Sequence, residues 1–382
     1  MRKRPIWWLP VLTLALLTLW GCKSNDMPEI EAPDQSQSGL NTPVPTPSPE
    51  PKEPIVISMV GDCTLASSQY NSDFETVVGD NYAWPFAGCV DVLSEDDFTI
   101  ANLECSFSET PLYGATTFYF CGPAEYANIL TEGSVECATM GNNHATDFGQ
   151  TGIDNTTACL DKVGVEHVVG SEGKIFDVND MKLGVYVTPW TVNGSWTPMP
   201  ENITNGVQAL KDQGADFIIV CCHWGIEGSY RVTQSQIDAA YAAIDAGANV
   251  VCGTHPHVLQ RTEEYNGGYI YYSLGNFSFG GNTNPRDKDT CIAQIVIEQD
   301  ETGGYYLKET RAIPYRLTSI TQKNDYQPVP YDPDSDEYAR TVSKLDGTFN
   351  GPDLSVDYSN LTGGGGGSSE PADEPSGSEG GE

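Results

Sequence analysis

The stretch Met140–Gly149, MGNNHATDFG, places two side-chain amides and an imidazole directly after a short apolar run. The run is Val135–Met140, and the polar side chains are Asn142, Asn143 and His144. An imidazole can bind a metal ion or transfer a proton, and an amide oxygen can also serve as a ligand. An apolar strand that stops at such side chains therefore predicts a site at one edge of a sheet.

Similar polar residues end four further apolar runs, and four of the five histidines lie at such places. Imidazoles, carboxylates and amide oxygens are ligands for divalent ions such as Mn, Zn, Fe or Mg. The carboxyl ends of parallel strands meet at one rim of an open α/β sheet, where ligands bind. The candidates at this rim are Asp62, Asn102 or Glu104, Asn143, His144, His223, His255 and His257.

Each candidate also has a structural interpretation. A lone buried histidine is more often a core residue than a ligand, and Asp62 alone could cap a helix or form an Asx turn. The pair His255 and His257 is more specific, because the two imidazoles flank a rigid proline. His167 lies away from every strand end, and we interpret it as structural.

From Ile55 onward, apolar runs alternate with stretches of helical pattern, and the candidate residues lie at the ends of the apolar runs. This alternation predicts an α/β fold with a largely parallel sheet covered on both faces. Two later runs, Ile292–Ile297 and Tyr305–Ile313, predict antiparallel edge strands. The expected parallel strands are Ile55–Val60, Phe98–Ala101, Val135–Met140, Leu183–Val187, Phe217–Cys222, Asn249–Cys252 and Tyr269–Leu274. The main expected helices are Ala124–Leu130, Gly152–Val163, Ile203–Gln213, Gln234–Ala246 and Glu337–Leu345.

A long segment without a helical or strand pattern, Ser106–Pro123, carries Tyr113, Phe118, Tyr119 and Phe120. Loops of this length in a compact domain are often functional, so we predict a substrate lid here.

Composition excludes some partners. The 382 residues carry a formal net charge of −34, which argues against nucleic acid, because phosphate backbones are bound by Lys and Arg. The same charge disfavours electrostatic adhesion to anionic lipid. Of the 11 cysteines, ten follow Cys22, and none forms a C-x-x-C pair. Several lie in apolar runs, which predicts reduced and buried thiols, although pairing cannot be decided from sequence.

The N-terminus predicts export. Residues 1–22 combine a basic start with the apolar run Ile6–Trp20 and end in LWGC, which resembles a bacterial lipobox with Cys22 as the lipidated residue. Trp20 is unusual in such a box, so plain secretion or an uncleaved anchor stays open. Residues 23–54 form a Pro/Ser/Thr-rich tether, and 362–382 form an acidic Gly/Ser tail that we expect to be disordered. We therefore expect an outward-facing lipoprotein of the cell membrane, with a C-terminal extension at 321–361.

Six ordered motifs resemble a known family. They are GD at 61–62, NLE at 102–104, NNHATDFG at 142–149, HWGIE at 223–227, GTHPH at 253–257 and YSLGNF at 272–277. This set resembles the CapA (PgsA-type) capsule-synthesis family, which is related to the calcineurin-like metallophosphoesterases. The resemblance covers about Ile55 to Leu317 and implies a four-layer α/β/β/α sandwich, which we place at 55–320.

The resemblance also implies roles for single residues. Asp62 would be the first metal carboxylate, and Glu104, rather than Asn102, the bridging acid. Asn143, His223 and His255 would complete one metal and His257 would serve the other. His144 would protonate a leaving oxygen with Asp147 orienting it, although Asp147 could also be an ordinary first-turn helix acid. Substrate contacts are expected from Asn102, Trp224, Glu227 and Asn276.

One position departs from the phosphoesterase pattern. Thr64 stands where that pattern has a histidine two residues after the first aspartate. The metal served by Asp62 and His257 is therefore short of a ligand, and one ion or two remain possible.

The expected function is surface-tethered capsule synthesis, anchoring or processing through a metal-dependent, hydrolase-like site. The expected partners are the membrane through the lipid anchor, an anionic polymer of the poly-γ-glutamate type and membrane-bound polymer-synthesis proteins. Two alternatives stay open: a generic exported metallophosphoesterase, and a non-catalytic polymer-binding scaffold.

Overall fold

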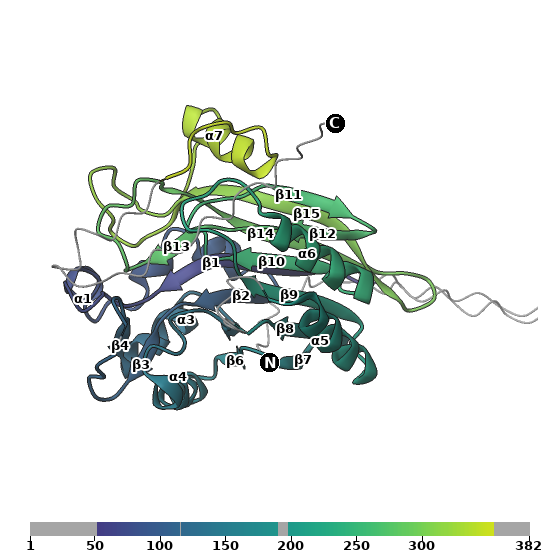
Figure 1. Ribbon diagram of the computed structural model, residues 1–382, viewed down its shortest axis with the longest axis horizontal. Coiled ribbons are helices and arrows are strands. Elements are labelled where there is room, and N and C mark those ends of the chain that lie inside the picture. Colours follow the sequence, from purple (N-terminus) through teal and green to yellow (C-terminus); the bar gives the residue numbers. More distant parts are fainter. Residues whose placement is uncertain (1–51, 115, 190–197, 355–382) are drawn as a thin grey trace, which may run out of the picture. The chain divides into compact units, whose positions relative to one another are not determined.

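The computed structural model describes residues 52–114, 116–189 and 198–354 (Figure 1). The predicted signal peptide at 1–22 with Cys22, nearly all of the tether and the acidic tail at 362–382 lie outside the described residues. Within the described ranges, no helix combines the length and apolar character needed to cross a membrane.

The first sheet has eight strands, seven of them in the order β16-β15-β14-β1-β2-β5-β6, with β13 paired to β1. Its strands β1, β2, β5 and β6 are parallel, whereas β14, β15 and β16 run antiparallel. The bounds are β1 Ile55–Thr64, β2 Phe98–Leu103, β5 Cys137–Met140, β6 Glu166–Val169, β13 Asn276–Phe279, β14 Asp289–Gln299, β15 Tyr305–Arg316 and β16 Val329–Pro330.

The second sheet has six strands in the order β11-β12-β10-β9-β8-β7. Its bounds are β7 Gly173–Val178, β8 Met181–Val187, β9 Phe217–His223, β10 Val250–Thr254, β11 Thr262–Tyr265 and β12 Gly268–Tyr271. Strands β8, β9, β10 and β12 are parallel to one another. A separate short pair consists of β3 (Ser106–Ser108) and β4 (Cys121–Pro123).

The two sheets pack face to face. A buried apolar cluster joins Ile57 and Ile100 of the first sheet to Val185, Ile219 and Val250 of the second. These strands are buried on both faces, which explains why they appear in the sequence as continuous apolar runs.

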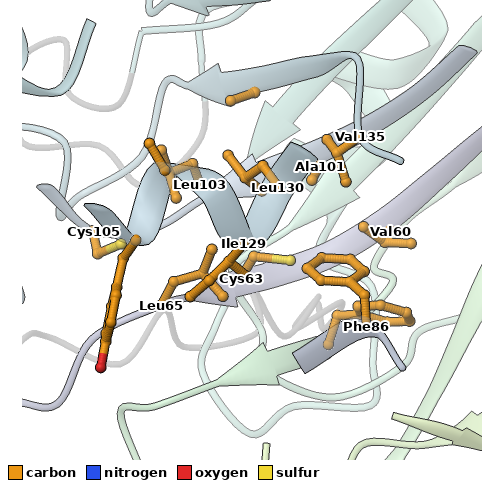
Figure 2. Packing of buried hydrophobic residues seen from close by; sticks show 14 of the residues in the cluster. Val60, Cys63, Leu65, Phe86, Ala101, Leu103, Cys105, Ile129, Leu130 and Val135 are labelled. Carbon is orange, nitrogen blue, oxygen red and sulfur yellow. The ribbon is translucent and has the colours of Figure 1, made fainter. Parts of the chain in front are cut away.

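Helices cover the outer face of each sheet. Over the first sheet lie α3 (Ala127–Glu132) and α4 (Gly149–Val163), and over the second lie α5 (Pro200–Asp212) and α6 (Gln234–Ala246). Figure 2 shows part of the first of these outer cores, where Ile129 and Leu130 lie near Ala101 and Leu103. Shorter helices are α1 (Asp73–Val78), α2 (Val90–Leu93) and α7 (Asp336–Leu345), with single 3-10 turns at Trp84–Phe86 and Ala124–Tyr126. The four-layer α/β/β/α sandwich is therefore confirmed.

Several details differ from the pattern-based prediction. The prediction of a single, largely parallel sheet was wrong, because the strands divide between two sheets. The prediction of an edge strand at Ile292–Ile297 was also wrong, because β14 lies between β1 and β15. The strands β6 and β7 were missed, because exposed and half-buried residues dominate both. Strand β1 does not stop at Gly61 but continues to Thr64 after a register shift. All ten cysteines after Cys22 are free, and nine of them are buried, which confirms the prediction of reduced thiols.

Candidate metal centre

The candidate site lies where strands of both sheets end. His223 is the last residue of β9, Glu104 follows β2, and His255 follows β10. Asp62 lies in the last part of β1, and Asn143 is in the turn after β5. Five parallel strands from two sheets therefore deliver their carboxyl ends to one place, as expected for ligand sites in α/β folds.

One group of ligand atoms surrounds the imidazole of His223. Its Nε2 lies 2.9 Å from Asn143 Oδ1, 3.2 Å from His255 Nδ1 and 3.5 Å from Glu104 Oε1. Two neighbouring ligands of an ion held at about 2.0–2.2 Å lie roughly 3–3.5 Å apart. Each of the three atoms therefore lies at a ligand-to-ligand distance from His223 Nε2, and all four atoms are of types that bind divalent ions.

A second group surrounds His257. Its Nδ1 lies 3.2 Å from Asp62 Oδ2, and its Nε2 lies 3.9 Å from Glu104 Oε1. Within the described part of the chain, Glu104 Oε1 is buried yet accepts no hydrogen bond. A buried carboxylate oxygen without a hydrogen bond is costly, and this atom lies between the two groups, where a bound cation would neutralise its charge.

The ionisable side chains of the site influence one another's pKa in the metal-free protein. Burial opposes the charged form of His257, but the carboxylates of Glu104 and Asp62 raise its pKa to about 10. Burial would raise the pKa of Glu104, but His257 and His223 lower it to about 2. Burial and the neighbouring histidines hold the pKa of His255 well below its usual range, which favours the neutral imidazole, the form that can bind a metal ion.

The backbone around the histidine pair is strained. His255 has φ 96° and His257 has φ 55°, in a region that L-residues rarely adopt. The preceding Gly253 has no room for a side chain, because a Cβ there would lie 2.1 Å from the Tyr272 carbonyl oxygen. Such strain persists only where the surroundings hold it, and it is concentrated at functional sites.

His144 forms a pair with Asp147. Its Nδ1 lies 2.9 Å from Asp147 Oδ2, which also accepts a hydrogen bond from the Phe120 backbone N–H at 3.0 Å. Burial opposes protonation, but the hydrogen bond to Asp147 and the charge of Glu104 raise the pKa of His144. Helix α4 begins only at Gly149, so Asp147 precedes the first turn and faces the imidazole instead.

A family model described as "Bacterial capsule synthesis protein PGA_cap" matches residues 56–281, more than half of the 382 residues. The chain belongs to this family. The family predicted from the six motifs is thereby confirmed.

Two curated relatives carry related names. The chain is 26% identical to the capsule biosynthesis protein CapA of Bacillus anthracis, over 71% of this chain and 72% of that protein. It is 29% identical to the PGA biosynthesis protein CapA of Bacillus subtilis (strain 168), over 52% of this chain and 58% of that protein. The chain thus spans less than two thirds of the second relative. Among solved structures, a novel phosphatase from Mycoplasma pneumoniae has a TM-score of 0.44 and 15% identity, over 81% of this chain and 99% of that one.

In this PGA_cap family member, three residues predicted to contact substrate form hydrogen bonds within the protein. Asn102 donates to Asp62 Oδ1 at 2.8 Å and is 6% exposed. Asn276 Oδ1 lies 2.8 Å from His257 Nδ1. The prediction for Trp224 was wrong, because its side chain is fully buried under α6 and its indole N–H donates to the Tyr272 carbonyl at 2.9 Å.

The fourth predicted substrate residue, Glu227, lies with His255 and His257 in a group whose ligand atoms are within 4.8 Å of one another. Sequence reasoning missed this possible ligand role. The available signal was an acid in the loop directly after the strand that ends at His223.

Thr64 occupies the place of the absent histidine. Its hydroxyl donates to Glu104 Oε2 at 3.2 Å, so it orients the shared carboxylate. Asn142 has a similar supporting position, because its Nδ2 donates to Asn102 Oδ1 at 3.0 Å and to the Leu103 carbonyl at 2.8 Å.

The segment predicted as a lid adjoins the His144 pair. The ring of Phe120 packs edge-on against His144, with 4.6 Å between ring centroids. Earlier in the same segment, the Thr117 carbonyl accepts hydrogen bonds from the side chains of Gln69 and Tyr70. The side chain of Tyr113 is 85% exposed. Closure of the segment Ser106–Pro123 over a substrate remains a prediction.

Proposed function

We propose that the chain is a metal-dependent, hydrolase-like protein of capsule synthesis. The observation that carries this proposal is the buried Glu104 Oε1, which faces His223 at 3.5 Å and His257 at 3.9 Å and accepts no hydrogen bond from the described residues. A divalent cation would satisfy this oxygen and the surrounding imidazoles together.

The residues that would hold one or two ions are Asp62, Glu104, Asn143, His223, His255 and His257. When bound, a divalent ion polarises a phosphoryl or acyl oxygen and makes hydroxide available near neutral pH. The chain's own contribution to the chemistry is His144. Burial opposes protonation of this imidazole, but the hydrogen bond to Asp147 and the charge of Glu104 raise its pKa, which favours a proton that would pass to a leaving oxygen.

The proposal also covers where the protein is located and which polymer it handles. The basic and apolar N-terminus with Cys22 supports a lipid-anchored protein that faces outward, and residues 23–54 would hold the domain away from the membrane. The name of one relative, a PGA biosynthesis protein, supports an anionic polymer of the poly-γ-glutamate type as the material handled. Membrane-bound polymer-synthesis proteins are part of the proposal as partners. A chain with net charge −34 would repel such a polymer, so bound cations would have to offset the repulsion at the site.

The direct test is turnover of a chromogenic phosphate ester by the purified protein. We expect turnover that disappears with a chelator and in His223→Ala. The matched control is His167→Ala, because His167 lies on β6 and pairs with Asp161 at 3.2 Å, away from the site residues. Full turnover in His223→Ala would show that the site is misplaced.

A complementation experiment separates catalysis from scaffolding. A capsule-deficient strain would receive the chain with His144→Ala and His257→Ala together. We expect no capsule. Full capsule from the double variant would favour the non-catalytic scaffold over both enzyme functions.

A further inference from the structure

The loop that follows His223 brings an acid to the metal centre. Its start is fixed by the buried Trp224, and its end by Thr233, which caps helix α6 with a reciprocal capping box. Between these anchors lies Glu227, which can direct a carboxylate oxygen to the ligand atoms of His255 and His257. A carboxylate beside two imidazoles is a common ligand set for a divalent ion.

The same loop contacts the histidine pair through its backbone. The Gly228 N–H donates to the Pro256 carbonyl at 2.8 Å. Pro256 is the residue between the two strained histidines, so this hydrogen bond fixes the peptide unit that holds both imidazoles. Any displacement of the loop would therefore move Glu227 and the two histidines together.

A C-terminal segment, Gly351–Leu354, holds this loop from the other side. Asp353 accepts hydrogen bonds from Ser229 Oγ at 3.0 Å and from the Tyr230 backbone N–H at 2.9 Å, and it pairs with Arg231. The Leu354 N–H donates to the Gly228 carbonyl at 2.9 Å. We name Gly351–Leu354 the C-terminal strap.

Gly228 is the contact point of the strap. It has φ +74°, and a Cβ at this position would lie 2.3 Å from the Leu354 carbonyl oxygen. The close approach therefore requires glycine. Gly228 accepts from the strap with its carbonyl and donates to Pro256 with its N–H, so it links the strap directly to the histidine pair.

Helix α7 anchors the strap to the sandwich. Lys344 is 4% exposed and donates to both carboxylate oxygens of Asp287, at 2.7 and 2.8 Å. Asp287 also accepts from the Tyr230 hydroxyl at 2.9 Å, and the Lys344 ammonium lies 4.9 Å from the centre of the Tyr230 ring. The loop, the helix and the start of β14 thus share one buried ion pair.

We propose that Glu227 is a further metal ligand of this site and that the C-terminal strap holds it there. This inference rests on the proposed function, because it requires that the site binds an ion. The strap and α7 lie beyond residue 281, where the family match ends. Asp353 is a positioning residue that acts on the site through Ser229 and Tyr230, which directly follow Gly228 in the loop.

The test is Mn²⁺ titration of the metal-free full chain, followed by electron paramagnetic resonance of free and bound Mn²⁺. We expect Glu227→Gln to weaken binding by about tenfold or more and to change the spectrum of the bound ion. We expect Asp353→Ala to weaken binding by up to about tenfold, the lower end of the effect of groups that hydrogen-bond metal ligands directly, because Asp353 acts through the loop backbone. Asp353→Asn keeps an acceptor for the Tyr230 N–H and should lie between Asp353→Ala and the wild type.

The controls are Glu132→Gln and Asp334→Ala, two exposed acids outside the loop and the strap. Both should bind Mn²⁺ as the wild type does. A wild-type chain that binds no Mn²⁺ would overturn the proposed function itself. Binding by the wild type that is unchanged in Glu227→Gln would overturn the ligand role, and unchanged binding in both Asp353 variants would overturn the role of the strap.

Discussion

Asn143 and His223 meet across the two sheets, with 2.9 Å between Asn143 Oδ1 and His223 Nε2. Asn143 follows β5 of the first sheet, and His223 ends β9 of the second. The site therefore exists only when the two sheets are packed together. Metal binding should stabilise this packing, because an ion held by both sheets binds only the folded state.

The His144 pair should control proton transfer without controlling metal binding. We expect His144→Ala to lower phosphate-ester turnover by about 10²–10⁴-fold while the metal content stays unchanged. Asp147→Asn should lower the pKa of His144, because the Asp147 carboxylate raises it. Nuclear magnetic resonance titration of the His144 imidazole measures this pKa. An unchanged pKa in Asp147→Asn would remove Asp147 from its orienting role.

A half-buried acid just before the start of β2, Asp96, should make stability depend on pH. Burial raises the pKa of Asp96 to about 7, with further contributions from Glu136 and Asp97 against the opposing hydroxyls of Ser58 and Thr99. Because the folded pKa exceeds the unfolded value, this group's contribution is fully present below about pH 4 and is lost as the pH rises through 7.

Asp96→Asn should therefore raise the free energy of unfolding at pH 8 by at least ~1.4 kcal/mol, the equivalent of one pKa unit. The gain should vanish near pH 4. Urea unfolding at both pH values measures it, with the exposed Asp91→Asn as the control. A gain of equal size at pH 4 and pH 8 would contradict the protonation argument.

The ion pair beneath helix α7 should be needed for stability. Lys344→Met leaves the buried carboxylates of Asp287 and Asp289 without their ammonium partner, which lies 2.7 Å from each. Loss of one partner from a buried pair costs about 3–5 kcal/mol. Urea unfolding should show a loss of this size, whereas the exposed Lys323→Met should change little. A loss below ~0.5 kcal/mol would show that the pair is dispensable.

Most strands of the fold could be predicted from the sequence, because buried parallel strands appear as continuous apolar runs. Helix α6 begins and ends where the pattern predicts, at Gln234 and Ala246, because its capping box and the following glycine are local signals. The division into two sheets is not local. It depends on which strands pair, so the alternation of runs and helices predicted one sheet, while the family resemblance implied two.

The site was predictable to a similar extent. Asp62, Asn143 and His223 could be predicted as site residues, because each follows an apolar run and this pattern is visible in the sequence. The burial of Trp224 and the approach of Glu227 to the histidine pair depend on how a loop folds back after β9. Contacts of this kind join residues distant in sequence, so spacing alone cannot predict them.

The metal centre is tested by the metal content of the purified protein after dialysis against Mn²⁺. Wild type, Asp62→Ala, His223→Ala and the control His167→Ala would be measured together. We expect at least one ion per chain in wild type and His167→Ala, a reduced content in Asp62→Ala and nearly none in His223→Ala. Equal metal content in all four proteins would contradict the proposed metal centre.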